Sequence, residues 1–240
     1  MNLLNTSCVV TGAARGIGLA IVRSLLSKGA RVVLSDVDPV ALDAAMAQLG
    51  DSRAIGCRTD VTVAADMATL TEAARQHAGP PALWVNNAGL ARHRNVVDYT
   101  TEEIDLMLAV NLKGTILGSQ AALRAMAQQR RGHIINIIST ASLRGIPGET
   151  VYCAAKWGVR GFTQGLREEA AKEGVRVTAL LPGGVDTDFW QDAVERTMPV
   201  EDFLTAQQVA EAVVSLAEME ENVVPQELVL RALRDRDFNH

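Results

Sequence analysis

The chain has 240 residues, of which 48% are hydrophobic and 21% charged, so it is long enough to bury a large core as one domain. A net charge of −5 and a pI of about 5.4 argue against nucleic acid or an anionic membrane as a partner. The N-terminus has no basic region and the chain has no run of about 18 apolar residues, so we expect a cytoplasmic protein without a membrane span. The cysteines lack CxxC spacing, so we expect free thiols and no metal site.

Residues 8–36 predict the first half of a nucleotide-binding unit. Cys8–Val10 has the pattern of a short buried strand, T-G-A-A-R-G-I-G follows at residues 11–18, and Leu19–Leu26 has helical spacing before the strand Arg31–Asp36. Glycines let a backbone approach a pyrophosphate closely, while a helix N-terminus offers free N–H groups and a positive dipole. The spacing is GxxxGxG, and a glycine turn of this kind also suits a methyltransferase.

Asp36 stands at the end of the second predicted strand. A carboxylate at this place can accept hydrogen bonds from the adenosine ribose, and it would repel a 2′-phosphate. The next residue is Val37 rather than a cation, and Arg15 is the one nearby candidate for a phosphate partner. We therefore expect NAD(H), with NADP(H) as the alternative. Asp36 could also be a helix-start acid before Pro39.

Strand and helix patterns alternate over the rest of the chain. The predicted strands are 53–58, 82–85, 133–138, 175–181 and 227–231, and the predicted helices are 39–49, 62–77, 102–130, 150–172 and 206–219. Such alternation predicts an α/β fold of one domain over residues 1–240: a Rossmann fold with a doubly wound parallel sheet of about seven strands and helices on both faces. Residues 188–203 have no strand pattern and predict a lid over the substrate.

Ser139, Tyr152 and Lys156 form the candidate catalytic set. Tyr152 and Lys156 are four residues apart, so on a helix they share one face. A lysine ammonium beside a phenol favours the phenolate, and we expect it to lower the tyrosine pKa from about 10. Ser139 follows an apolar run that predicts a buried strand, and the end of such a strand is where α/β proteins place their chemistry. Alone, however, this spacing also occurs by chance.

Several motifs together are similar to those of the classical short-chain dehydrogenases/reductases. They are T-G-A-A-R-G-I-G, N-N-A-G at 86–89, N-L-K-G at 111–114, the Ser139/Tyr152/Lys156 set, and P-G-G-V-D-T at 182–187. The resemblance covers about residues 5 to 220. Ser142 stands where the family often has glycine. The usual aspartate–glycine–glycine ending is absent. In its place the segment 226–231 resembles a subgroup of bacterial oxidoreductases that act on small hydroxy compounds.

The resemblance implies a role for each matching residue. Tyr152 would be the proton donor or acceptor, Lys156 would lower its pKa and bind the nicotinamide ribose, and Ser139 would position the substrate oxygen. Asn111 would interrupt its helix and hold a water that links Lys156 to solvent. The remaining implied cofactor-binding residues are Gly12, Arg15, Gly16, Ile17, Gly18, Asp36, Asp60, Val61, Asn87, Ala88, Gly89, Val185 and Thr187.

We therefore expect an oxidoreductase that interconverts a secondary alcohol and a ketone with NAD(H), using Tyr152 as general acid/base. A dinucleotide-binding regulator without turnover is the alternative from another class, because a fold alone does not define a function. The family also implies a homodimer or homotetramer through the helices 102–130 and 150–172. Their apolar stripes are equally explained by packing on the sheet.

The substrate pocket is expected beside Ser139, at residues 91–95 and in the predicted lid. Phe189 and Trp190 favour an apolar substrate body, because aromatic side chains offer large contact areas. Four cationic side chains in the same loops favour a small hydroxy or oxo acid instead; they are Arg92, His93, Arg94 and Arg144. Solvation of these four side chains at the surface is the simpler interpretation.

Overall fold

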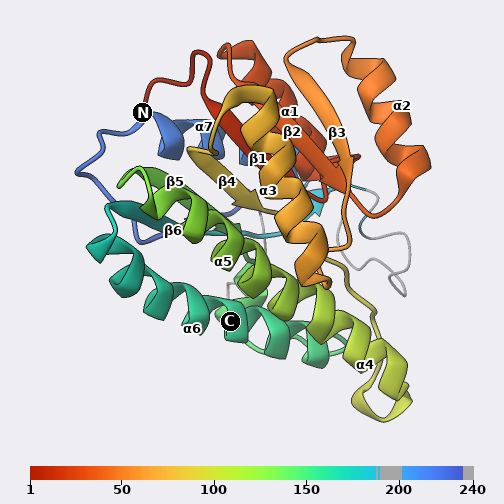
Figure 1. Cartoon of the computed structure of the whole chain (residues 1–240). Coiled ribbons are helices and arrows are strands. Elements are labelled where there is room, and N and C mark those ends of the chain that lie inside the picture. The colour runs from red at the N-terminus through yellow and green to blue at the C-terminus, as the bar shows by residue number, and fades with distance from the viewer. Residues whose placement is uncertain (188, 190–201, 235–240) are drawn as a thin grey trace.

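A seven-stranded parallel sheet forms the centre of the protein in a computed structural model that describes residues 1–187, 189 and 202–234 (Figure 1). The strand order is β3-β2-β1-β4-β5-β6-β9, and every neighbouring pair is parallel. The strands are β1 (Ser7–Thr11), β2 (Arg31–Asp36), β3 (Ala54–Arg58), β4 (Leu83–Asn86), β5 (Gly132–Ile137), β6 (Val175–Pro182) and β9 (Glu227–Leu230). The predicted doubly wound parallel sheet is confirmed.

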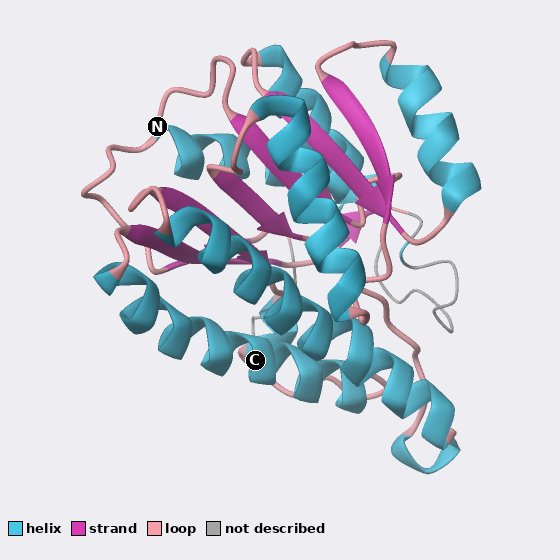
Figure 2. Cartoon of the chain, viewed as in Figure 1, coloured by secondary structure: helices cyan, strands magenta, loops and turns pink. Residues whose placement is uncertain are grey.

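Helices cover both faces of the sheet (Figure 2). One core cluster packs α1 (Gly16–Ser27), α2 (Pro39–Leu49) and α7 (Ala206–Glu218) against the strands. A second cluster does the same for α3 (Ala64–Ala78), α5 (Gly114–Ala127) and α6 (Thr150–Lys172). The central strands are buried on both faces; all eight residues of β6, for example, are buried. Such strands are mostly apolar, and the polar residues that β6 does contain, Arg176 and Thr178, are buried with it.

The strand order reverses between β1 and β4, which are hydrogen-bonded neighbours at the centre of the sheet. Chain segments leave these strands in opposite directions, so the loops at their carboxyl ends diverge and leave a crevice. The loop after β1 contains the glycine turn, and N-N-A-G begins at the last residue of β4 and continues into the loop that follows. The topology therefore brings two predicted motifs together, although they are far apart in the sequence.

The predicted helix 102–130 differs from the structure in its interior and at its end. It consists of α4 (Thr101–Leu108), a π-helical turn (Ala109–Lys113) and α5. Thr100 and Glu103 form a capping box at its start. The last turn closes at Ala127, and Arg130 adopts a positive φ of 52°. The helix therefore ends three residues before its predicted end.

Residues 101–127 are long and apolar enough to span a membrane by length and composition alone. In the part of the chain that the structure describes, this is the one helix that meets that criterion, and 39% of its most apolar window is buried inside the protein. A core helix of a layered α/β protein meets the same criterion, because it must be apolar toward the sheet. The predicted absence of a membrane span stays a prediction.

Two short parallel strands, β7 (Val185–Asp186) and β8 (Leu204–Thr205), flank the segment in which the lid was predicted. Strands of two residues are too short to show a periodic pattern, and the sequence did not predict them. Most of the predicted lid at 188–203, including Trp190, lies outside the described residues. In these strands Val185 pairs with Leu204 and Asp186 with Thr205.

Candidate active site

A cavity of about 1200 Å³ occupies the crevice at the carboxyl edge of the sheet. It collects most of the residues predicted to bind a cofactor or substrate. The predicted site residues in its wall are Gly12, Arg15, Gly16, Ile17, Asp36, Asp60, Val61, Asn87, Ala88, Gly89, Ser139, Tyr152, Lys156, Val185 and Thr187. Gly18 and Asn111 are buried residues outside that lining. Residues at the carboxyl ends of six strands thus meet Tyr152 and Lys156 of α6 in one continuous space.

The glycine turn brings backbone rather than side chains to the cavity. Gly12 has a φ of +61°, and a Cβ there would lie 2.7 Å from Cα of Ala88. A Cβ on Gly18 would collide with the carbonyl oxygen of Gly12. Helix α1 begins at Gly16 behind an extended Arg15, with no side-chain cap and no acid in its first turn. Its first N–H groups and the positive end of its dipole therefore face the cavity wall, as a pyrophosphate site requires.

The N-N-A-G turn is tied to the glycine turn by hydrogen bonds. Asn87 Nδ2 donates to the carbonyl oxygens of Thr11 and Gly12 at 3.0 and 2.9 Å. The Thr11 hydroxyl accepts from the backbone N–H groups of Asn87 and Ala88 at 3.0 and 3.1 Å. Thr11 was not among the predicted site residues. A hydroxyl at the last position of a strand that leads into a glycine turn is the signal that could have identified it.

Asp36 is held in a fixed orientation at the cavity wall. Its Oδ2 accepts from the Ala14 N–H at 3.1 Å and its Oδ1 from the Asp38 N–H at 3.2 Å, and the residue is 8% exposed. The helix-start interpretation does not hold, because Asp38 is the N-cap of α2 and accepts from Val40 and Ala41. Asp36 thus keeps a carboxylate at the end of β2, where a ribose would bind.

Tyr152 and Lys156 share one face of α6, as their spacing predicts. Lys156 Nζ lies 5.5 Å from the centroid of the Tyr152 ring and donates to the Ile137 carbonyl oxygen at 3.3 Å. Ser139 follows β5 and faces the same part of the cavity, and a hydrogen bond from its side chain to Tyr152 lowers the pKa of the phenol. The Ala141 N–H donates to Ser139 Oγ at 3.0 Å. The three predicted catalytic side chains are therefore brought together.

Burial controls the proton affinities of this pair. Removal of water raises the pKa of Tyr152 above its ordinary value, and the negative charge of Glu149 raises it further. Burial lowers the pKa of Lys156 to about 8. The net direction for Tyr152 is opposite to the predicted lowering. The reason is that desolvation of a buried phenolate outweighs the hydrogen bond from Ser139, which acts in the opposite direction.

Asn111 lies in the π-helical turn and is fully buried. Its side-chain amide donates to the carbonyl oxygens of Leu90 and Met107 at 2.7 and 2.9 Å, and its Oδ1 accepts from the Leu90 N–H at 3.2 Å. A Cβ on Gly89 would lie 2.8 Å from this oxygen and 3.7 Å from Lys156 Nζ. The predicted interruption of the helix is confirmed. The predicted water between Asn111 and Lys156 stays a prediction.

The substrate side of the cavity combines an aromatic wall with charged groups. The Phe189 ring lies 5.9 Å from the Tyr152 ring at an interplanar angle of 56°. Loop 91–95 lines the cavity together with Arg144, as predicted. Within this loop, His93 Nε2 contacts Glu149 Oε1 at 3.2 Å, and both side chains are only 12% exposed. His93 is therefore not a solvated surface residue. Glu149 was missed, although its place three residues before Tyr152 puts it within one helical turn.

The residues present fit a bound dinucleotide. A turn that admits no Cβ, an uncapped helix N-terminus and an oriented carboxylate at the end of β2 lie along one wall of the cavity. The tyrosine, lysine and serine line the same cavity. This arrangement is typical of a nicotinamide-dependent oxidoreductase of the α/β class.

Comparison with known proteins agrees with this class. A sequence model of the short chain dehydrogenases matches residues 6–197, and the chain belongs to this family of oxidoreductases. An uncharacterized oxidoreductase of Staphylococcus aureus is 40% identical over 185 residues, which are 77% of this chain and 80% of the relative. The 2-(S)-hydroxypropyl-CoM dehydrogenase 3 of Xanthobacter autotrophicus is 37% identical over 229 residues, covering 89% of this chain and 90% of the relative.

A solved structure shows the same fold. It is the alcohol dehydrogenase of the archaeon Thermococcus sibiricus in complex with 5-hydroxy-NADP, with a TM-score of 0.87 and 29% identity. The alignment covers 96% of this chain and 98% of the archaeal one. The predicted family is thereby confirmed, and members of this family use a nicotinamide dinucleotide.

Proposed function

We propose that the protein interconverts a secondary alcohol and a ketone with NAD(H). The observation that carries the proposal is the convergence of Ser139, Tyr152 and Lys156 at the end of the dinucleotide cleft. A relative named for a 2-hydroxypropyl substrate, in which the hydroxyl is secondary, supports this substrate class. A structural neighbour named an alcohol dehydrogenase supports the same reaction.

Each residue of the set has a chemical task in this proposal. A bound nicotinamide supplies the acceptor or donor of hydride. During oxidation the Tyr152 oxygen takes the hydroxyl proton, and during reduction it returns a proton to the carbonyl oxygen. The Ser139 hydroxyl orients the substrate oxygen, while the Lys156 charge favours the phenolate form as the proton is taken. The Phe189 ring covers Tyr152 on the substrate side and keeps water from it.

The NAD(H) preference is supported by the environment of Asp36. Its carboxylate accepts from the N–H groups of Ala14 and Asp38, so it cannot turn away from an incoming 2′-phosphate without losing both hydrogen bonds. The neighbouring Val37 is exposed and offers no compensating charge. Arg15 lines the same cavity and is the group that would favour NADP(H). The 5-hydroxy-NADP bound to the archaeal neighbour agrees with that second possibility.

The aromatic wall favours a small to medium substrate with an apolar group. Tyr152 belongs to a small apolar cluster with Ala91, Met107, Ala141 and Cys153, and Phe189 packs against that cluster. A reductase of small hydroxy or oxo acids with NADP(H) is the second candidate. It is favoured by three arginines in the cavity wall, Arg92, Arg94 and Arg144, because a carboxylate would be drawn to them.

The decisive experiment compares the wild-type protein with Tyr152→Phe on a panel of secondary alcohols, ketones and hydroxy acids. We expect the variant to bind NAD(H) with little change while its turnover falls at least about a thousandfold, because the proton carrier is lost. Turnover by Tyr152→Phe close to the wild-type rate would contradict the assigned role. Turnover of hydroxy acids alone would favour the second candidate.

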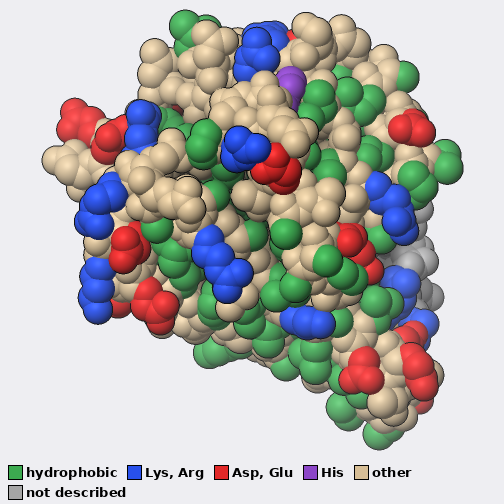
Figure 3. All heavy atoms as spheres, in the orientation of Figure 1, with side chains coloured by type: hydrophobic (Ala, Val, Ile, Leu, Met, Phe, Trp, Pro, Cys, Tyr) green, Lys and Arg blue, Asp and Glu red, His purple; other side chains and the backbone are tan. Residues whose placement is uncertain are grey.

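We also propose that the protein is a homodimer or homotetramer that associates through α4, α5 and α6. Leu106 on α4 is 44% exposed and Trp157 on α6 is 49% exposed. Figure 3 shows hydrophobic side chains at the surface in the region of α5 and α6. Light scattering of the purified protein tests the proposal, and a monomer at all accessible concentrations would contradict it.

A further inference from the structure

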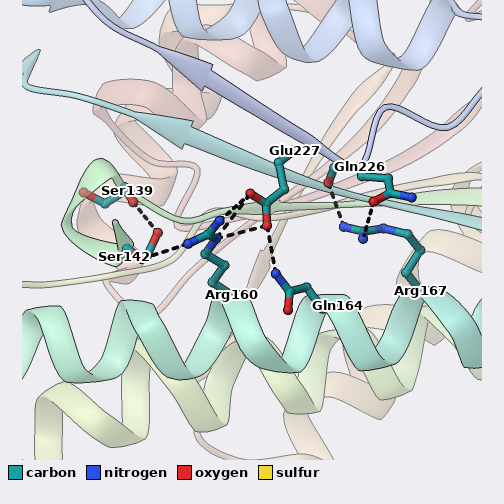
Figure 4. Close-up of polar contacts among 7 residues, drawn as sticks. All are labelled: Ser139, Ser142, Arg160, Gln164, Arg167, Gln226 and Glu227. Carbon is teal, nitrogen blue, oxygen red and sulfur yellow. Dashed lines mark hydrogen bonds and ion pairs between the residues drawn. The ribbon is translucent and has the colours of Figure 1, made fainter. Parts of the chain in front are cut away.

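A charged pair links the last strand of the sheet to the helix that contains Tyr152 (Figure 4). Arg160 Nε lies 3.0 and 3.2 Å from the two carboxylate oxygens of Glu227, and its Nη2 lies 2.9 Å from Oε2. The side chains are 27% and 23% exposed. Gln164, one turn further along α6, donates to the same carboxylate at 3.2 Å. The bidentate geometry leaves the guanidinium little freedom to rotate.

The other edge of the same guanidinium reaches the turn that follows β5. Arg160 Nη1 donates to the Ser142 carbonyl oxygen at 3.4 Å. Ser142 is fully buried, and its backbone N–H and its hydroxyl both donate to the Ser139 carbonyl oxygen, at 3.0 and 2.7 Å. Ser139 Oγ in turn accepts from the Ala141 N–H. The 3₁₀ turn Thr140–Ser142 therefore determines where the Ser139 hydroxyl points, and Arg160 fastens that turn from outside the cavity.

We infer that Arg160 and Glu227 are positioning residues that hold the Ser139 hydroxyl in place against Tyr152. Glu227 fixes the guanidinium, the guanidinium fixes the Ser142 carbonyl, and Ser142 fixes the backbone of Ser139. Small displacements of a catalytic group are costly, because a shift of about 1 Å can reduce a rate roughly a hundredfold. The inference rests on the proposed function, since it assigns a purpose to the orientation of Ser139.

Helix α6 also supplies a matched control. Arg167 lies seven residues after Arg160 on the same face and likewise bridges α6 and the segment that leads into β9 (Figure 4). It donates to the carbonyl oxygens of Gln226 and Val177 at 2.7 and 3.3 Å. These partners, Gln226 directly before β9 and Val177 in β6, lie away from the Ser139 turn. Loss of Arg167 thus weakens the attachment of β9 without releasing Ser142.

The test compares Arg160→Met, Glu227→Gln and the control Arg167→Met in the full-length protein. For Arg160→Met we expect kcat to fall roughly tenfold with an unchanged Kd for NAD(H), because the cofactor wall is untouched. The apparent pKa of Tyr152 in the kcat profile should rise, since the Ser139 hydrogen bond that lowers it is weakened. Glu227→Gln should change both quantities in the same direction but less. Arg167→Met should stay within about twofold of wild type in kcat.

Amide hydrogen exchange supplies a readout that does not depend on turnover. The Ala141 and Ser142 amides should exchange at least about fivefold faster in Arg160→Met than in the wild type, and remain unchanged in Arg167→Met. Equal losses of kcat in the two arginine variants, or unchanged exchange at residues 139–143, would overturn the inference. If Arg160→Met fails to fold, Arg160→Lys replaces it, because lysine keeps the charge but cannot bridge Glu227 and Ser142 with a planar fork. If the wild type turns over no alcohol or ketone, the proposed function fails, and hydrogen exchange still decides the inference.

Discussion

Lys156 is a buried cation, and its substitution by methionine is expected to stabilise the protein while abolishing its activity. The residue is 4% exposed, and its ammonium donates to the Ile137 carbonyl oxygen at 3.3 Å. Burial lowers its pKa from 10.5 to about 8. Methionine has a similar length and no charge, so Lys156→Met fills the same space without the cost of burying an ammonium.

The size of the effect follows from the pKa. A drop from 10.5 to about 8 corresponds to a cost of about 3 kcal/mol at about 1.36 kcal/mol per unit. Loss of the hydrogen bond to Ile137 takes away about 1 kcal/mol. Lys156→Met should therefore raise the free energy of unfolding by about 2 kcal/mol at pH 7. The folded lysine binds fewer protons than the unfolded one between pH 8 and 10.5, so wild-type stability rises with pH in that window.

Urea unfolding of both proteins without cofactor, at pH values from 7 to 10, measures this difference. The advantage of Lys156→Met should be fully present below pH 8 and should shrink as the pH rises toward 10.5. Lys172→Met is the control, because Lys172 ends the same helix in solvent, and its free energy of unfolding should change by less than about 0.5 kcal/mol. A less stable Lys156→Met at pH 7, or a difference independent of pH, would refute the reasoning.

Three further expectations concern the cavity. Glu149→Gln removes a negative charge that raises the pKa of Tyr152, so the rising limb of the oxidation rate should move to lower pH; a shift to higher pH would contradict this. Asp36→Ala should shift the ratio of kcat/KM with NADP(H) to kcat/KM with NAD(H) upward by on the order of a hundredfold, because the carboxylate no longer repels the 2′-phosphate while Arg15 remains. A wild-type preference for NADP(H) would show the cofactor assignment to be wrong. Phe189→Ala should raise KM roughly tenfold for substrates with bulky apolar groups, and equal effects on small substrates would count against an aromatic wall.

Local signals in the sequence were sufficient for the framework of the fold. Strands buried on both faces are rich in apolar residues, and β6 is apolar over Val175–Pro182 except at Arg176 and Thr178. The alternation of such runs with helical spacing leaves few topologies other than a doubly wound sheet. The Tyr152–Lys156 pair was equally predictable, because residues four apart on a helix must share a face. The glycine turn likewise depends only on its neighbours along the chain.

The tertiary structure decided the features that depend on distant segments. The direction of the Tyr152 pKa follows from how completely the surrounding elements exclude water, which no local pattern records. In the π-helical turn, Asn111 is hydrogen-bonded to Leu90, which lies in a loop 21 residues earlier in the chain. Arg160 and Glu227 are 67 residues apart and meet because β9 joins the sheet beside β6. The sequence thus determined most of the elements and the candidate catalytic set. Packing determined the charge states and supports of that set, because these arise only where separate elements meet.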